Sequence, residues 1–290
     1  MKFNNFNGIL LIDKDKDCTS RDIVNKAIKI FNTKKIGHTG TLDPLATGVL
    51  VLCIGNATKL VDILTSTEKR YIAEFTLGTL TDTLDNTGNI LKEEKTNISK
   101  EKIEEALVKL TGEYIQETPI YSAVKVNGKK LYEYARNNEY VELPKRLVNI
   151  KEFKLLDYKL ENDKTIIKVE TLVSKGTYIR ALASDLAKSL DTIGIMSSLR
   201  RIKQGSFDIK DCLKIDEVTT DTKLINMIDV LDDYKKVIID DKFYNNIKDG
   251  QIINNTFDSK KIAFIYQNNL KALYHVYEKD ENKIKPYKMF

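Results

Sequence analysis

The sequence predicts an α+β fold. Helical and strand-like segments follow one another without regular βαβ alternation, which favours an α+β layer over a doubly wound parallel sheet. The continuous apolar run at 48–55 is typical of a strand that is buried on both faces. Residues 236–290 combine short β-like pieces with many aromatic and lysine residues, after a boundary near 232–234. Together these features indicate a large mixed domain followed by a small β-rich one.

The N-terminal elements are indicated by short apolar patterns. Residues 8–13 (GILLID) predict a short buried strand, and a helix capped by Thr19 or Ser20 should follow it. The apolar stripe of this helix consists of Ile23, Val24, Ala27, Ile28 and Phe31.

The middle of the chain alternates between strand and helix signals. Residues 71–78 and 165–173 alternate in polarity, as half-buried strands do. Residues 99–112 and 176–190 have helical periodicity, and Thr177 is the expected cap of the second helix. The stretch 215–231 predicts a short helix at most.

Composition limits the possible functions. The 290 residues include 42% hydrophobic and 31% charged residues, and the net charge of +5 permits a polyanionic partner without requiring one. Cys18, Cys53 and Cys212 are dispersed and there are only two histidines, which disfavours a structural zinc site. The odd cysteine count fits a reducing cytosol, and the apolar run near the N-terminus is too short for a membrane span.

The segment GHTGTLDPLATG, residues 37–48, has three possible interpretations. It could be a glycine-rich turn, since Asp-Pro often opens turns. A phosphate-binding loop is disfavoured because the GxxxxGK[ST] pattern is absent. It could also display a carboxylate, because Pro44 holds Asp43 extended and the adjoining strand is rigid. An ionised carboxylate of this kind is suited to attack on a sugar carbon.

Six motifs in series identify a family. The segment GHTGTLDPLATGVLVLCIGNATK resembles the catalytic motif of the TruB-type pseudouridine synthases. The remaining motifs, in chain order, are GILLIDKDKDCTS before it, then EKRYIAEFTLGTLTDTLDNTG, PIYSAVKVNGKKLYEYAR, VSKGTYIRALASDLAKSL and LRRIKQGSF. They cover residues 8 to about 207 in the family's order, so the resemblance is specific.

The resemblance implies both fold and activity. It predicts a mixed, mainly antiparallel sheet in a pseudouridine synthase-like catalytic domain over 1–232, with an RNA-gripping insertion at 119–149. A short PUA-like RNA-binding domain should occupy 233–290. The implied enzyme is an isomerase that makes pseudouridine at position 55 in the T-loop of tRNA. It cuts the bond from the ribose to N1 of a flipped-out uracil and reattaches the base through C5.

The resemblance also assigns residues to the site. Asp43 is the catalytic aspartate, Arg180 is its partner, and Tyr71 stacks on the target base. The carboxylate could either add to the sugar or remove a proton. Arg180 is also unusual on physical grounds, because a helix N-terminus disfavours a cation. Further substrate-binding positions implied by the family pattern are His38, Tyr178, Leu199, Lys14 and Lys59.

The expected partner is the T-stem-loop of tRNA, whose phosphates would meet basic side chains. Candidate contacts are Lys34, Lys35, Lys69, Arg70, Lys125, Lys129, Lys130, Lys145, Arg146, Arg200, Arg201 and Lys203. We expect a cytoplasmic monomer that needs no metal, other cofactor or membrane.

Two departures and two alternatives accompany this interpretation. Asp15 and Asp17 replace the family's usual Pro and Gly, which leaves the role of Lys14 open, and Met196 replaces an aromatic residue or histidine. One alternative function is a catalytically silent module of the same fold that binds or folds tRNA. Another is a nucleoside glycosidase that uses Asp43 with Asp82 or Asp85.

Overall fold

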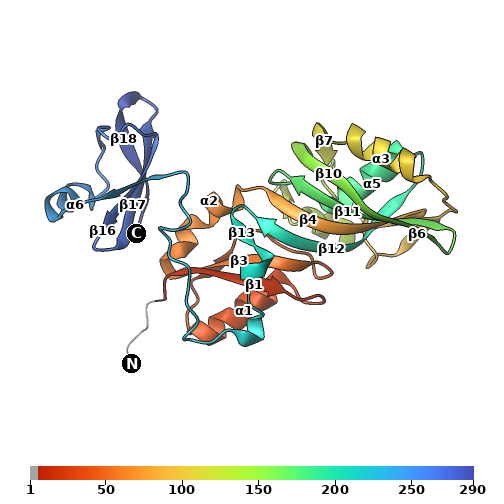
Figure 1. The fold of residues 1–290 in the computed structure, drawn as a ribbon, viewed down its shortest axis with the longest axis horizontal. Helices are drawn as coiled ribbons and strands as arrows, with labels where there is room; N and C mark the ends of the chain where they lie inside the picture. The colour runs from red at the N-terminus through yellow and green to blue at the C-terminus, as the bar shows by residue number, and fades with distance from the viewer. Residues whose placement is uncertain (1–5) are drawn as a thin grey trace.

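The computed structural model describes residues 6–290, which form a large sheet and a smaller C-terminal sheet with helices packed around them (Figure 1). The helices are α1 (Ser20–Phe31), α2 (Val61–Thr65), α3 (Lys100–Lys109), α4 (Leu131–Arg136), α5 (Ile179–Ser189) and α6 (Asp241–Ile247). Single 3₁₀ turns are η1 (Gly55–Leu60), η2 (Ile209–Asp211) and η3 (Ile215–Glu217).

The large sheet has nine strands within the described residues. They are β1 (Gly8–Lys14), β2 (Ile36–His38), β3 (Thr47–Ile54), β4 (Lys69–Leu77), β7 (Gly112–Glu117), β10 (Lys145–Glu161), β11 (Lys164–Val173), β12 (Gly194–Gln204) and β13 (Phe207–Asp208). Their order is β1-β3-β12-β4-β11-β10-β7, with β2 paired to β3 and β13 paired to β12. All neighbours are antiparallel except β3 and β12, so the prediction of a mixed, mainly antiparallel sheet is confirmed.

The two halves of this sheet meet at a narrow parallel contact. β3 and β12 share only the pairs Arg200 with Thr47 and Arg201 with Gly48. Gly48 has a φ of 101°, and a Cβ atom there would lie 2.1 Å from the Arg201 carbonyl oxygen. Only glycine lets the two backbones approach this closely. Gly48, the last residue of the 37–48 segment, therefore allows the two halves of the sheet to pair.

β1 and β3 are covered on both faces, as the apolar run at 48–55 predicts. On one face Leu50 and Leu52 belong to a core that includes α1 and, in the other half of the sheet, α3 and α5. On the opposite face Val49 and Val51 contact apolar residues of η1, α2 and the C-terminal sheet. In Figure 1, α2 lies on the side of the large sheet that faces the C-terminal sheet.

The C-terminal sheet has five strands, in the order β14-β16-β17-β18-β15. They are β14 (Lys235–Ile238), β15 (Ile253–Asn254), β16 (Lys261–Tyr266), β17 (Asn269–Tyr277) and β18 (Asp280–Met289). Its own core contains Phe264, Tyr274 and Ile284 together with residues of α6. This separate small β unit agrees with the predicted α+β class and PUA-like appendage.

Local predictions were mostly confirmed, with one correction. Thr19 caps α1 through a capping box with Asp22, and β4 alternates between buried and half-buried residues along its whole length. Thr177, however, is not the cap of α5. The N-cap position is Tyr178, which makes no side-chain capping bond, while the Thr177 hydroxyl donates to the Ser174 carbonyl at 3.0 Å. The stretch 215–231 contains η3, turns and an isolated bridge from Ile225 to Ile9, so the short helix expected there at most is the 3₁₀ segment η3.

Two short hairpins lie outside both sheets. β5 (Thr79–Thr81) pairs with β6 (Ile90–Glu93), and β8 (Lys125–Val126) pairs with β9 (Lys129–Lys130). The second hairpin and α4 make up much of the predicted insertion at 119–149. Across residues 6–290, none of the helices has both the length and the apolar character needed to cross a bilayer.

Candidate active site

Asp43 is carried by a loop that is anchored on both sides of it. Leu42, Leu45 and Ala46 are buried, whereas the Asp43 side chain is 38% exposed. Ser20, the first residue of α1, accepts a hydrogen bond from the Leu42 N–H at 2.9 Å and donates one to the Leu42 carbonyl at 3.1 Å. The apolar neighbours therefore fix the loop and leave the carboxylate turned outward.

The first motif holds the loop from the other side. Lys14 is fully buried, and its ammonium donates to the carbonyls of Cys18 at 2.7 Å, Asp15 at 2.9 Å and Pro44 at 3.4 Å. The Asp17 N–H also donates to the Pro44 carbonyl, at 2.9 Å. Burial lowers the pKa of Lys14, opposed by the nearby Cys18 and carboxyl groups. The structure thus encloses Lys14 beneath the loop and does not bring it into the cleft described below.

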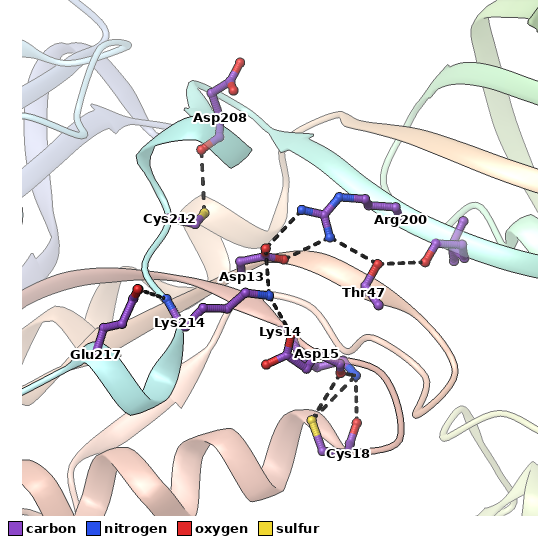
Figure 2. A network of polar contacts seen from close by, with 11 residues as sticks. Asp13, Lys14, Asp15, Cys18, Thr47, Arg200, Asp208, Cys212, Lys214 and Glu217 are labelled. Carbon is purple, nitrogen blue, oxygen red and sulfur yellow. Dashed lines mark hydrogen bonds and ion pairs between the residues drawn. The ribbon is translucent and has the colours of Figure 1, made fainter.

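A second polar network ties the first motif to β12 (Figure 2). The Arg200 guanidinium donates to both oxygens of Asp13, at 3.0 and 3.1 Å, and Lys214 lies 3.0 Å from the same carboxylate. Lys214 also pairs with Asp15 at 2.5 Å, so the unusual Asp15 has a cationic partner. Burial alone would raise the pKa of Asp13, but the hydrogen bonds from Arg200 and Lys214 outweigh it and hold the pKa below its ordinary value.

Arg180 lies in the first turn of α5 and is 6% exposed. Its Nε lies 3.0 Å from an Asp43 oxygen, while Nη1 and Nη2 donate to the Thr83 and Tyr121 carbonyls, both at 2.9 Å. The planar guanidinium is therefore held on three sides, with one edge toward Asp43. This pair joins the two halves of the sheet, since Asp43 precedes β3 and Arg180 follows β11.

Asp85 is a second carboxylate near Arg180, and the sequence analysis did not place it there. It is 4% exposed, and one of its oxygens lies 3.8 Å from the Arg180 Nε. Its other oxygen accepts hydrogen bonds from the Thr83 hydroxyl and the Thr87 N–H, at 2.7 and 2.9 Å. In the sequence, residues 79–89 show only the composition of a turn. That composition does not indicate which residues the turn will contact.

A cleft of about 580 Å³ opens in front of the Asp43–Arg180 pair. Of the sequence-predicted residues, Tyr71 on β4, Leu199 on β12 and Tyr178 at the start of α5 line it. The rest of the lining consists of Gly40, Thr41, Leu42, Thr65, Lys69, Tyr121, Ser122, Ala123, Tyr132, Lys175, Gly176, Thr177, Ile179, Met196 and Arg201. The arrangement combines a carboxylate with an aromatic and apolar wall, on which a flat base could stack.

Gln116 fixes one side of this wall. This buried residue of β7 accepts a hydrogen bond from the Tyr178 N–H at 2.8 Å and donates to the Tyr178 carbonyl at 3.2 Å. The side-chain amide thereby replaces the capping group that α5 otherwise lacks. Sequence reasoning missed Gln116, whose only signal was a polar residue at an inward position of a short strand.

Besides Lys14, two more predicted substrate contacts lie outside the cleft lining. His38 is half-buried at the end of β2, and its Nδ1 accepts from the Gly40 N–H at 3.4 Å. Burial, aided by the charge of Arg201, lowers the pKa of His38. Lys59 donates to the Met289 carbonyl at 2.6 Å, so the structure places its ammonium against the C-terminal strand.

The residues predicted to contact phosphate differ in the partners that they have in the structure. Several form intramolecular ion pairs: Arg70 with Glu152 and Glu170, Arg200 with Asp13, and Lys129 with Glu139. Lys69 and Arg201 are buried at the cleft instead. As for metals, no cluster of three or more His, Cys, Asp or Glu side chains in the described chain is arranged to hold an ion.

Comparison with known proteins identifies the family. The family model for TruB family pseudouridylate synthase (N terminal domain) matches residues 28–179. The tRNA pseudouridine synthase B of Staphylococcus aureus (strain MSSA476) is 41% identical over 303 residues, which cover 98% of this chain and 99% of that protein. The protein of the same name from Bacillus cytotoxicus is 39% identical over 296 residues, covering 97% and 96%. The chain belongs to the TruB family of pseudouridylate synthases and is an isomerase.

Solved structures agree on the fold. An H/ACA RNP bound to a substrate RNA containing 2′-deoxyuridine includes a chain with a TM-score of 0.71 and 21% identity, covering 98% of this chain and 84% of that one. The archaeal box H/ACA sRNP Nop10–Cbf5 complex gives a TM-score of 0.66 at 18% identity, covering 100% and 87%. At these identities the likeness concerns the fold alone.

Proposed function

We propose that this protein converts uridine to pseudouridine at position 55 in the T-loop of tRNA. The observation that carries the proposal is the state of the Asp43 carboxylate. One of its oxygens lies against Arg180, and the other accepts no hydrogen bond from residues 6–290. This free oxygen belongs to a residue that lines a cleft large enough for a nucleotide. Relatives about 40% identical are tRNA pseudouridine synthases B, which supports tRNA as the substrate.

The chain's residues account for the main requirements of the reaction. The target uridine must leave its loop, at an expense of a few kcal/mol. Stacking of the base on Tyr71 and the neighbouring wall would return roughly 1–3 kcal/mol. Arg180 orients the Asp43 carboxylate, which either adds to the anomeric carbon or removes a proton while the base reattaches through C5. Tyr178 and Leu199 would bound the flipped nucleotide, His38 would insert into the RNA loop outside the cleft, and Lys14 would act through the loop that carries Asp43.

We further assign residues 1–232 to catalysis, 119–149 to gripping the RNA, and 233–290 to a PUA-like RNA-binding domain. The separate sheet that begins at Lys235 supports this boundary. The cations of the 119–149 segment support the second assignment. A monomer in the cytoplasm, where bacterial tRNA is modified, completes the proposal, and the reaction requires no metal.

The two alternatives receive less support from the geometry. A silent RNA-binding module has no use for a carboxylate held beside a buried guanidinium. A two-carboxylate glycosidase needs a second acid in the cleft, but neither Asp82 nor Asp85 lines it. One Asp85 oxygen accepts from the Thr83 hydroxyl and the Thr87 N–H, and Asp82 accepts from the Asn89 N–H at 2.9 Å. Asp82 and Asp85 therefore stabilise the turn at residues 79–89.

The test uses tRNA transcript that carries tritium at C5 of uracil. The wild-type protein should release tritium and Asp43→Asn should not, although both should bind the transcript equally. Asp13→Asn is the matched control, because it removes another paired carboxylate outside the cleft, and it should retain release. Equal binding without release by the wild type would establish the silent module, and release from free uridine would establish the glycosidase.

A further inference from the structure

One wall of the cleft carries three cationic side chains from three separate elements. Lys69 begins β4, Lys175 precedes α5, and Arg201 belongs to β12. Lys69 is 7% exposed and Arg201 is 1% exposed, whereas Lys175 lies at the exposed rim. Lys69 and Arg201 differ from most basic residues of the chain, because they are buried at the wall of a cleft rather than placed on a solvated surface.

Backbone carbonyls hold the two buried cations in place. The Lys69 ammonium donates to the carbonyls of Thr65 and Thr67, both at 2.7 Å. An ammonium has three N–H groups, so one remains for a ligand. The Arg201 guanidinium donates to the carbonyls of Val49 at 2.7 Å and Gly40 at 3.2 Å. Both side chains are thus fixed before any substrate arrives.

Neither Lys69 nor Arg201 forms an ion pair with any carboxylate in residues 6–290, whereas the next residue along β4, Arg70, pairs with both Glu152 and Glu170. A buried charge without a counter-ion is unfavourable. Burial, together with the charges of Arg201 and Lys175, lowers the pKa of Lys69 to about 8. An anion that enters the cleft would supply the missing counter-ion.

We propose that Lys69, Lys175 and Arg201 form a phosphate subsite that binds one phosphodiester adjacent to the target uridine. The inference rests on the proposed function, which provides an RNA nucleotide at Asp43. Every such nucleotide carries a phosphodiester on each side, so a base stacked on Tyr71 brings phosphate into the same cleft.

The subsite also positions the reacting sugar. Arg201 contacts the carbonyl of Gly40, which lies three residues before Asp43 on the same loop. Binding of phosphate at this wall therefore fixes the nucleotide against the element that carries the carboxylate. Because Lys69 and Arg201 are held in advance, little ordering is needed when RNA binds.

The experiment combines RNA and protein changes in the full chain. T-arm hairpins are made with a single neutral methylphosphonate linkage at successive positions on either side of the target uridine. Their affinities are measured for the wild type, Lys69→Met and Lys175→Met. Lys109→Met is the matched control, because Lys109 is an exposed lysine on α3 that does not line the cleft.

We expect one neutral linkage to weaken binding by roughly tenfold for the wild type and for Lys109→Met, since a charge-assisted contact is lost. The same linkage should weaken Lys69→Met and Lys175→Met by less than about twofold. Equal losses in all four proteins at every linkage would overturn the subsite. If Lys69→Met does not fold, the exposed Lys175→Met carries the comparison. Failure of the wild type to convert the all-phosphate hairpin would instead refute the proposed function.

Discussion

Two aspartate–arginine pairs lie beside the contact between β3 and β12 in the large sheet. They differ in how many oxygens of the carboxylate have a partner. The Asp13 carboxylate lies 3.0 Å from Arg200 and 3.0 Å from Lys214, and its side chain is 13% exposed. The Asp43 carboxylate also lies 3.0 Å from its arginine, but it is 38% exposed and meets that guanidinium through Nε alone.

The difference shows what separates a structural pair from a reactive one. Arg200 donates two parallel hydrogen bonds to Asp13, so both oxygens are occupied. Arg180 uses its two Nη atoms on backbone carbonyls, which fixes the guanidinium independently of Asp43. Asp43 is therefore oriented by Arg180, yet retains an oxygen for chemistry.

The largest expected contrast comes from replacing each arginine by lysine. Arg180→Lys keeps the charge but leaves the Thr83 and Tyr121 carbonyls without their donor. The single-turnover rate of pseudouridine formation should therefore fall by about 100-fold or more. Arg200→Lys should stay within about threefold of the wild type. Similar losses in both variants would mean that the two pairs do not differ in function.

The next contrast concerns stability and pH. Asp13→Asn should lower the free energy of unfolding by about 1–3 kcal/mol at neutral pH, because it leaves Arg200 without its carboxylate and Lys214 with Asp15 alone. The folded-state pKa of Asp13 lies below its ordinary value of 3.8. Its contribution is thus present above that value and disappears as the pH falls through the folded pKa.

Urea unfolding of Asp13→Asn and the wild type at several pH values checks this expectation. The two proteins should differ most at neutral pH and converge as the pH falls below 3.8. A difference that persists undiminished in acid would show that the loss is steric rather than electrostatic.

A smaller effect is expected from pH on RNA affinity. Lys69, with a pKa of about 8, faces Arg201 and Lys175, and a bound phosphate should raise that pKa. Affinity for the T-arm hairpin should then be greatest below pH 8 and fall by about tenfold between pH 7 and 9, as Lys69 loses its proton in the free protein. Lys69→Arg, which stays charged, should remove this dependence, and an unchanged slope in that variant would assign it to another group.

The smallest expected effect lies in the turn of the first motif. Asp17 has a φ of 63°, a left-handed conformation that glycine adopts more readily. Asp17→Gly should raise the free energy of unfolding by about 0.5 kcal/mol in urea titrations and leave turnover unchanged. Reduced turnover would show that the Asp17 carboxylate itself is required.

Much of the site was predictable because its residues sit in contiguous motifs. The motif resemblance selected Asp43, Arg180 and Tyr71, and the structure brings them to one cleft. Contacts between distant segments were not predictable in the same way. The approach of Asp85 to Arg180 depends on how a turn folds against α5, and no local pattern encodes it.

The fold shows the same limit. The long strand β10 gave no clear alternation, since its pairing with β11 shifts register between Ile150 and Glu152 and again between Leu155 and Asp157. Each irregularity moves the following side chains to the opposite face, so the period of two breaks. The pairing of β4 with β11 is regular and the irregularities opposite its other edge belong to β12, so alternation predicted β4 correctly.

The narrow contact between β3 and β12 has a consequence for the chain during its synthesis and folding. Asp43 belongs to the half synthesised first and Arg180 to the half synthesised later, and only two residue pairs join β3 to β12. Neither half alone assembles a carboxylate with its counter-ion and a base-binding wall. A nascent or partly unfolded polypeptide therefore lacks a complete catalytic site, which forms only once both halves of the sheet have paired.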